Sequence, residues 1–255
     1  MKFLCLHGSY GSAANFQTQL APFVDEAAKS GLASFRWIDG FHAVEPPARF
    51  GDYFGKRPLY AFTERDGVAA MNEFAERMQQ FAVESTPEKT IRKFFQGQEV
   101  YPKEAFQDTM QRLRDVLAAD PEIEGILGYS EGAAAAASLI LEERSRCKEQ
   151  GVPRRLKCAI FFGGWPPLVI KEGKVQCMLT DDVDDDLVID VATCHVVGCK
   201  DPYLHGSMTL FDVCDPDTAE LFDHGSGHTL PRDPEVLKEL VAVIEKMLPE
   251  SAVGR

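Results

Sequence analysis

Residues 123–141 read Ile-Glu-Gly-Ile-Leu-Gly-Tyr-Ser-Glu-Gly-Ala-Ala-Ala-Ala-Ala-Ser-Leu-Ile-Leu, and this stretch decides the predicted fold. The apolar run at its start is typical of a buried strand, and the alanine-rich run that follows favours a helix. Ser130 stands between the two, in the pattern Gly-Tyr-Ser-Glu-Gly, which indicates the sharp strand-to-helix turn that exposes a nucleophilic serine. A side chain at Gly128 or Gly132 would collide with the neighbouring backbone in such a turn. The alternative is a glycine-bounded turn whose serine has no chemical role.

Apolar runs of strand length recur along the chain and alternate with segments of helical periodicity. This alternation is typical of a parallel sheet with helices on both faces. The predicted strands are residues 2–6, 34–38, 123–129, 157–162, 193–197 and 219–222. The predicted helices are residues 15–29, 104–119, 132–149 and 234–247, the last with Asp233 as N-cap before a proline. We expect one α/β-hydrolase domain over residues 1–255, with a mostly parallel, doubly wound sheet of about six strands.

The connection between the second and third predicted strands is too long for a single crossover helix. Within it, residues 41–95 hold ten of the 25 aromatic residues of the chain. These include Phe41, Phe50, Tyr53, Phe54, Tyr60, Phe62, Phe94 and Phe95. We expect residues 41–102 to form a cap over a pocket. The alternative is an ordinary helical excursion whose rings pack against the core.

The composition limits the cellular compartments and the classes of partner that we expect. The formal net charge of −13 disfavours nucleic acid, which needs clustered Lys and Arg. No apolar run approaches the roughly 20 residues of a membrane helix, and the apolar start is too short for a secretory signal. The cysteine count is odd, and Cys5, Cys158 and Cys194 lie in strand-like segments, so we expect reduced thiols and a cytoplasmic protein. The acidic run at 181–186 lacks the glycine and glutamate of a calcium loop and is interpreted as a solvated loop.

A nucleophilic serine needs a base, which comes last in the chain order of this fold. His224 and His228 both follow the last predicted strand, in His-Gly-Ser-Gly-His. We choose His228, because the glycines before it allow its imidazole to reach back toward Ser130. The same spacing resembles a two-histidine zinc pair, but the glycines disfavour the helix that would put both rings on one face. No metal is expected.

The acid that orients the base is expected just after the penultimate strand. Asp201 lies there, before a proline that ends the segment. Its carboxylate would hold the tautomer of the histidine and stabilise the imidazolium. The alternative is a turn aspartate, with Asp212, Asp215 and Asp223 as weaker rivals for the catalytic role.

Acyl transfer also needs two N–H donors for the developing oxyanion. One is the backbone N–H of Glu131, which follows the nucleophile, and the other is expected from Ser9, in the glycine-rich turn after the first strand. That turn lacks the Gly-Lys pair of a phosphate-binding loop. The remaining histidines are interpreted as structural groups: His7, His42, His195 and His205.

Four motifs occur in the order in which a known family carries them. They are Phe-Leu-Cys-Leu-His-Gly at 3–8, Gly-Tyr-Ser-Glu-Gly-Ala at 128–133, Gly-Cys-Lys-Asp-Pro at 198–202 and Gly-His-Thr-Leu-Pro-Arg at 227–232. Over nearly its whole length the chain resembles the family of serine hydrolases, the FSH type common in fungi. Members are similar to carboxylesterases, and fungal relatives include thioesterases that release polyketide chains from a synthase carrier domain.

The resemblance implies Ser130, Asp201 and His228 as the triad, in agreement with the argument from the residues. Many relatives carry Gln where this chain has Glu131. Because the oxyanion contact is made by the backbone, this difference should alter local charge more than mechanism. The segment from about 41 to 102 is longer than in the shortest relatives.

We therefore expect a serine hydrolase that cleaves an ester or thioester of an apolar acyl group, in the manner of a polyketide-releasing thioesterase or esterase, without a cofactor. The alternatives are an acyltransferase on the same triad and an acyl-binding or delivery partner of a synthase whose hydrolysis is incidental. The expected substrate-binding residues are Tyr10, Tyr129, Phe50, Phe54 and Phe62. Two partners are compatible with this hypothesis: a carrier domain of a polyketide synthase and a second copy of the chain.

Overall fold

Six parallel strands form the central sheet, in the order β10-β9-β6-β5-β1-β2. The computed structural model describes residues 1–31, 33–46, 48–50, 53–64, 84–95, 99–183 and 188–248. The strands are β1 (Lys2–Leu6), β2 (Ser34–Trp37), β5 (Ile123–Tyr129), β6 (Cys158–Phe162), β9 (Ala192–Val197) and β10 (Ala219–Asp223). The predicted parallel sheet of about six strands is confirmed.

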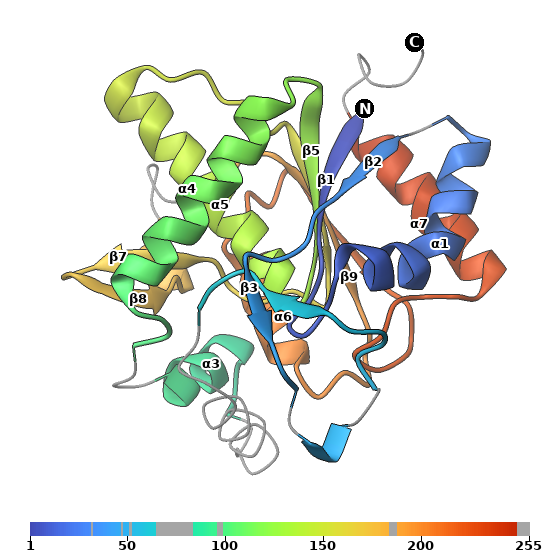
Figure 1. Ribbon diagram of the computed structural model, residues 1–255, viewed down its shortest axis with the longest axis horizontal. Coiled ribbons are helices and arrows are strands. Elements are labelled where there is room, and N and C mark those ends of the chain that lie inside the picture. The colour runs from blue at the N-terminus through green and yellow to red at the C-terminus, as the bar shows by residue number, and fades with distance from the viewer. Residues whose placement is uncertain are drawn as a thin grey trace.

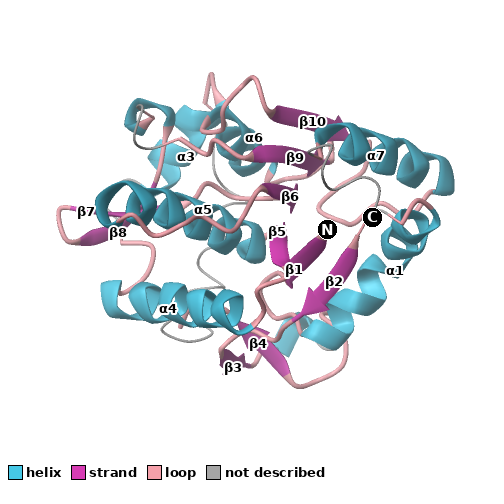
Figure 2. Cartoon of the chain, turned by 90° about the horizontal axis from the view of Figure 1, so that it is seen from above, coloured by secondary structure: helices cyan, strands magenta, loops and turns pink. Residues whose placement is uncertain are grey.

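Helices cover both faces of this sheet (Figures 1 and 2). One face carries α1 (Ala13–Lys29) and α7 (Pro234–Met247), and the other carries α4 (Lys103–Ala119) and α5 (Glu131–Gln150). The packing of strand β1 explains why nearly all of its residues are apolar. Phe3 and Cys5 pack with α1 and α7, while Leu4 and Leu6 pack with α4 and α5. All four side chains are buried, because a strand covered on both faces has no solvent side.

Two antiparallel hairpin-like pairs and two helices lie outside the predicted pattern. They are β3 (His42–Val44) with β4 (Leu59–Ala61), β7 (Leu168–Lys171) with β8 (Lys174–Cys177), α3 (Pro87–Phe95) and α6 (Leu204–Asp212). The β7–β8 turn consists of Glu172 and Gly173, with φ of 49° and 79°. A two-residue turn with two positive φ values matches the twist of a hairpin, but glutamate seldom adopts the first of them.

The insertion between β2 and β5 contributes β3, β4 and α3 and a short 3₁₀ turn (Ala48–Phe50). The cap predicted over residues 41–102 also includes residues 65–83 and 96–98, which lie outside the described residues. An isolated bridge pairs Gly11 with Tyr60, so β4 lies beside the turn that follows β1. The aromatic insertion therefore begins next to the C-terminal edge of the central sheet.

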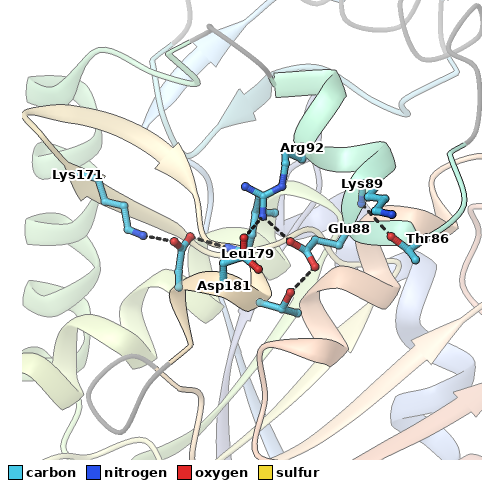
Figure 3. Close-up of polar contacts among 9 residues, drawn as sticks. Thr86, Glu88, Lys89, Arg92, Lys171, Leu179 and Asp181 are labelled. Carbon is cyan, nitrogen blue, oxygen red and sulfur yellow. Dashed lines mark hydrogen bonds and ion pairs between the residues drawn. The ribbon is translucent and has the colours of Figure 1, made fainter.

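Helix α3 is held to the body of the protein by an ion-pair network (Figure 3). Arg92 lies 2.5 Å from Glu88 on its own helix and 2.8 Å from Asp181, in the 3₁₀ turn Thr180–Asp182. The hydroxyl of Thr180 donates to the carboxylate of Glu88. Since Arg92 and Asp181 are about half or more exposed, these ion pairs add little to stability, and α3 also buries Ile91 and Phe94.

The same turn accounts for the described part of the acidic run. Asp182 pairs with Lys171 of β7 and accepts the N–H of Leu179 at 2.9 Å. Asp181 pairs with Arg92. Residues 184–187 lie outside the described residues.

All seven cysteines are free thiols. In the ranges that the structure describes, no helix has both the length and the apolar character needed to cross a bilayer.

His195 is a buried histidine of β9 that packs between two phenylalanine rings. Its ring centroid lies 5.2 Å from Phe161 and 5.2 Å from Phe211, and Nε2 is 3.1 Å from Thr193 Oγ1. Burial lowers the pKa of His195 to about 3, because the imidazolium would lose its hydration. The residue belongs to the core, as expected from the sequence.

This burial makes stability depend on pH. The folded pKa is below the unfolded value, so the unfolded chain takes up the proton first and the free energy of unfolding falls as the pH drops below ~6.5. We expect His195→Leu to make this fall shallower by up to ~1.4 kcal/mol per pH unit. Urea unfolding at intervals between pH 7 and pH 4 measures it. If the free energy of unfolding fell equally steeply with pH in the variant and the parent, His195 would not be a buried, neutral group.

Candidate active site

Ser130 lies in a strained turn between β5 and α5. Its φ of 53° and ψ of −114° fall outside the regions that ordinary residues prefer, at a cost of about 1–3 kcal/mol. The surrounding backbone holds this conformation. The N–H of Ser130 donates to Phe162 O at 3.0 Å, and its carbonyl accepts the N–H of Ala133 at 3.1 Å. Its side chain is thereby half-buried at the C-terminal edge of the sheet.

The two glycines around Ser130 permit this turn by close packing. A Cβ on Gly132 would lie 2.3 Å from Leu6 O and 2.5 Å from His7 O. A Cβ on Gly128 would lie 2.5 Å from the Cα of Ala133. These are backbone atoms that cannot move aside independently, so the collision expected from the sequence is confirmed.

His228 and Asp201 form a hydrogen-bonded pair. His228 Nδ1 donates to Asp201 Oδ2 at 2.7 Å, and the Tyr203 N–H donates to Asp201 Oδ1 at 2.7 Å. The aspartate side chain is only 2% exposed. With Nδ1 carrying the proton, Nε2 of His228 remains free to accept one. Asp201 follows β9 and His228 follows β10, so adjacent strands bring both residues to one edge of the sheet.

Aromatic rings hold the imidazole of His228 in place. Tyr129 stacks on it at 5.2 Å between centroids, and Tyr203 meets it edge-on at 4.9 Å. The Tyr129 hydroxyl also donates to the carbonyl of His228 at 3.0 Å. Gly163 leaves the space for this ring, because a Cβ there would lie 2.9 Å from its Cε1. Burial raises the pKa of the Tyr203 hydroxyl, and nearby Asp201 adds to the effect, so this ring stays neutral.

Two backbone N–H groups near Ser130 can bind an anion. Glu131 begins α5, and Ser9 lies in the turn after β1. Within the described residues neither N–H has a hydrogen-bond partner. A Cβ on Gly8 would lie 3.3 Å from Ser130 Cβ, so this turn comes close to the serine. The helix N-terminus adds a positive potential at the same place.

Ser130 and His228 open onto one cavity of about 1000 Å³. Its wall is largely aromatic and aliphatic. It includes Tyr10, Phe50, Tyr53, Phe54, Phe95, Tyr101, Phe106, Met110, Tyr129, Trp165, Leu168 and Tyr203. The cavity extends from Tyr53, which is 74% exposed, to Phe106 and Met110, which are buried in the core. It therefore runs from the surface into the interior and suits a long apolar group.

Four of the five residues predicted to bind substrate lie on this wall: Tyr10, Tyr129, Phe50 and Phe54. Phe62 lies elsewhere. It is fully buried, and its ring contacts His7 at 4.8 Å and Phe41 at 5.7 Å between centroids. The alternation of β4 and the segment after it turns this ring toward the core, a direction that aromatic content alone does not reveal.

The wall also contains residues that the sequence analysis did not select. Trp165 follows β6, Tyr101 precedes α4, and Leu168 begins β7. Trp165 also contacts Phe95 of α3 at 6.2 Å between ring centroids. None of these residues belongs to a recognisable motif, so only the folded chain brings them to the site.

His7 also lines the cavity, but both of its ring nitrogens are engaged by backbone groups. His7 donates from Nδ1 to Gly8 O at 2.7 Å and accepts the Gly40 N–H on Nε2 at 2.8 Å, the structural role expected of it. Burial lowers the pKa of His7, which keeps the ring neutral for both bonds. His224 is half-buried and does not line the cavity. Among the described residues, no cluster of three or more His, Cys, Asp or Glu side chains is arranged to hold a metal ion.

Comparison with known proteins decides the family. The family model described as "Serine hydrolase (FSH1)" matches residues 1–240. The chain belongs to the serine hydrolase (FSH1) family. It is 23% identical to "Esterase FPY3" of Fusarium mangiferae, with all of both chains covered. It is 24% identical to "Hydrolase phiM" of Talaromyces stipitatus, over 97% of this chain and 87% of that protein.

Solved structures support the fold of this serine hydrolase. The Bacillus cereus carboxylesterase is 17% identical, with a TM-score of 0.53 over 96% of this chain and 88% of that one. The acyl-protein thioesterase 2 of Zea mays is also 17% identical, with a TM-score of 0.53 over 96% and 93% of the two chains. The predicted α/β-hydrolase fold and serine hydrolase family are confirmed.

The two ends of α5 provide a test of the packing around Ser130. Gly132→Ala places a methyl group against two carbonyl oxygens, and we expect a loss of about 3 kcal/mol in the free energy of unfolding. Gly151→Ala at the C-cap meets no atom within 4 Å and carries only the penalty of its φ of 67°, about 1 kcal/mol. Urea unfolding midpoints compare the two variants. A Gly132→Ala variant as stable as Gly151→Ala would contradict the packing argument.

Proposed function

We propose that this serine hydrolase cleaves an ester or thioester of an apolar acyl group through an acyl-enzyme on Ser130. The observation that carries the proposal is that Ser130 and the His228–Asp201 pair open onto one cavity whose wall is largely apolar. The esterase names of the fungal relatives agree with this chemistry. The thioesterase among the solved structures shares the fold.

In the first half-reaction, Ser130 Oγ attacks the acyl carbon and Nε2 of His228 takes the hydroxyl proton. Asp201 accepts the hydrogen bond from Nδ1 and stabilises the imidazolium that forms. The carbonyl oxygen becomes an oxyanion, which accepts hydrogen bonds from the N–H groups of Ser9 and Glu131. The tetrahedral intermediate collapses when the imidazolium gives its proton to the departing alcohol or thiol.

In the second half-reaction, water takes the place of the leaving group. His228 removes a proton from the water, which attacks the acyl carbon and forms a second oxyanion at the same two donors. Collapse of this intermediate returns the proton to Ser130 Oγ and releases the carboxylic acid. In the described residues Ser130 Oγ and His228 are not hydrogen-bonded, and such contacts commonly tighten only when substrate binds.

The cavity also limits the class of substrate. Its buried end lies among Phe106 and Met110, and its exposed end beside Tyr53, so an acyl chain extends inward while the leaving group faces solvent. A leaving group attached to a large carrier then remains outside the protein. A polyketide chain on a synthase carrier domain belongs to this class of substrate, as does a simple ester of a medium-length acid.

The assignment of the reacting residues is tested by substitution. We expect Ser130→Ala to keep its fold and lose activity by several orders of magnitude, because the three groups act as a unit. His228→Ala should be almost as damaging, whereas His224→Ala, off the cavity, should keep most of the activity. Hydrolysis of a p-nitrophenyl ester and labelling with a fluorophosphonate report the effects. A Ser130→Ala variant that keeps more than about a tenth of the activity would overturn the proposal.

The acyl preference is tested with a series of chain lengths. Each methylene buried in the cavity contributes up to about 0.8 kcal/mol, so two further carbons should raise kcat/KM by about tenfold until the cavity is filled. Phe54→Ala removes a ring from the wall and should shift the preferred length. Phe62→Leu, which alters the neighbouring core but not the wall, should lower stability and leave the preference unchanged.

The readout is kcat/KM for matched esters and thioesters from two to ten carbons, with folding checked by circular dichroism. A steady fall from acetyl upward in the parent would show that the cavity does not receive the acyl chain. Product analysis with a competing alcohol shows whether water is the acceptor.

A further inference from the structure

One side-chain hydrogen bond joins the two residues that carry the candidate oxyanion donors. Ser9 Oγ donates to Glu131 Oε2 at 2.6 Å, although 122 positions separate the residues in the chain. Ser9 belongs to the turn after β1, and Glu131 is the first residue of α5. The bond therefore connects the two segments whose N–H groups must point at the same oxygen.

The carboxylate of Glu131 is built into its surroundings. The residue is 8% exposed, and its second oxygen, Oε1, lies 3.4 Å from the hydroxyl of Tyr101. A buried carboxylate is costly unless hydrogen bonds and nearby positive charge compensate it. Two hydroxyl donors and the N-terminal turn of α5 provide this compensation. Glu131 thus acts as an acceptor at a fixed place, with both oxygens already engaged.

The turn that carries Ser9 is fixed on its other side by the backbone and His7. The Gly11 N–H donates to Gly8 O at 3.1 Å, and His7 Nδ1 donates to the same oxygen. These bonds set the shape of the turn. These bonds do not set the distance between the turn and α5. In this turn it is Ser9 whose side chain donates a hydrogen bond to α5.

We propose that Glu131 is a positioning residue that sets the spacing of the oxyanion hole by holding Ser9. The inference rests on the proposed function. Donors stabilise an oxyanion when they lie 2.7–3.1 Å from it, and a displacement of about 1 Å can lower the rate by about 100-fold. A short bond between the two donor residues is a direct means of keeping that spacing. Its loss should lower the rate of the chemical step more than the binding of substrate.

The test compares four variants. Ser9→Ala and Glu131→Ala each remove the bond and keep both backbone N–H groups, and we expect kcat to fall about 10- to 100-fold with KM within about threefold. The double variant should be no slower than the slower single variant, because both remove the same interaction. Glu131→Gln keeps an acceptor oxygen for the Ser9 hydroxyl, and should restore most of the kcat lost in Glu131→Ala.

A purely structural role is separated by a control and by inhibitor binding. Ser207→Ala also removes a buried serine hydrogen bond, to Gly164 O at 2.9 Å, but lies on α6 away from the oxyanion donors. It should lower the unfolding midpoint and keep kcat. A trifluoromethyl ketone forms a tetrahedral adduct on the serine, so its affinity should weaken in Ser9→Ala and Glu131→Ala by the same factor as kcat/KM. Affinity for the acid product should stay unchanged.

Three outcomes would overturn the inference. The single variants could lose stability but keep kcat, the double variant could combine the two losses, or Glu131→Gln could be as slow as Glu131→Ala. These outcomes are distinct from failure of the proposed function. If Ser130→Ala is inactive while Ser9→Ala and Glu131→Ala keep kcat, the nucleophile stands and only the positioning role falls.

Discussion

The close contact between Gly132 and the end of β1 is the constraint on which the site depends. With no Cβ at residue 132, the first turn of α5 can lie against the carbonyls of Leu6 and His7. The chain then leaves β5 through a residue with positive φ, and Ser130 projects from the edge of the sheet. The same contact brings the N–H of Glu131 and the turn containing Ser9 to one side of the serine. A single steric condition therefore places the candidate nucleophile and the candidate oxyanion donors together.

The site divides into a part fixed by the sheet and a part formed by aromatic segments. Ser130 and the His228–Asp201 pair follow strands of the sheet, whose parallel arrangement brings their C-terminal ends to one edge. The polar atoms are held by backbone groups, as Asp201 is by the Tyr203 N–H. The wall of the cavity comes partly from the insertion, through Phe50 and Phe54. Part of the cavity wall therefore comes from a different segment of the chain than the polar groups beside Ser130, while Tyr129 and Tyr203 belong to both.

Local patterns in the sequence predict the sheet and the main helices, because each depends on a few neighbouring residues. The candidate reacting residues lie where the chain order places them, just after β5, β9 and β10. Helix α7 begins at Pro234 as expected, since Asp233 accepts the N–H groups of Glu235 and Val236. The β7–β8 hairpin escaped prediction because its turn uses a glutamate at positive φ. Phe62 was expected on the pocket wall but is buried in the core. The direction of the Phe62 ring and the contact of Ser9 with Glu131, 122 positions away, depend on the tertiary structure. No local sequence pattern contains this information.

The position of Glu131 explains how an acid is tolerated beside a site where negative charge develops. The N-terminus of α5 presents about half a positive charge. This charge stabilises the Glu131 carboxylate on one side and favours an anion at the Glu131 N–H on another. The carboxylate turns toward Ser9 Oγ and Tyr101, whose hydroxyls donate to it. The N–H has no partner among the described residues and stays available. The hydrogen bonds from Ser9 and Tyr101 hold the Glu131 carboxylate away from the Glu131 N–H. The carboxylate and the oxyanion of the proposed reaction therefore do not compete for that N–H.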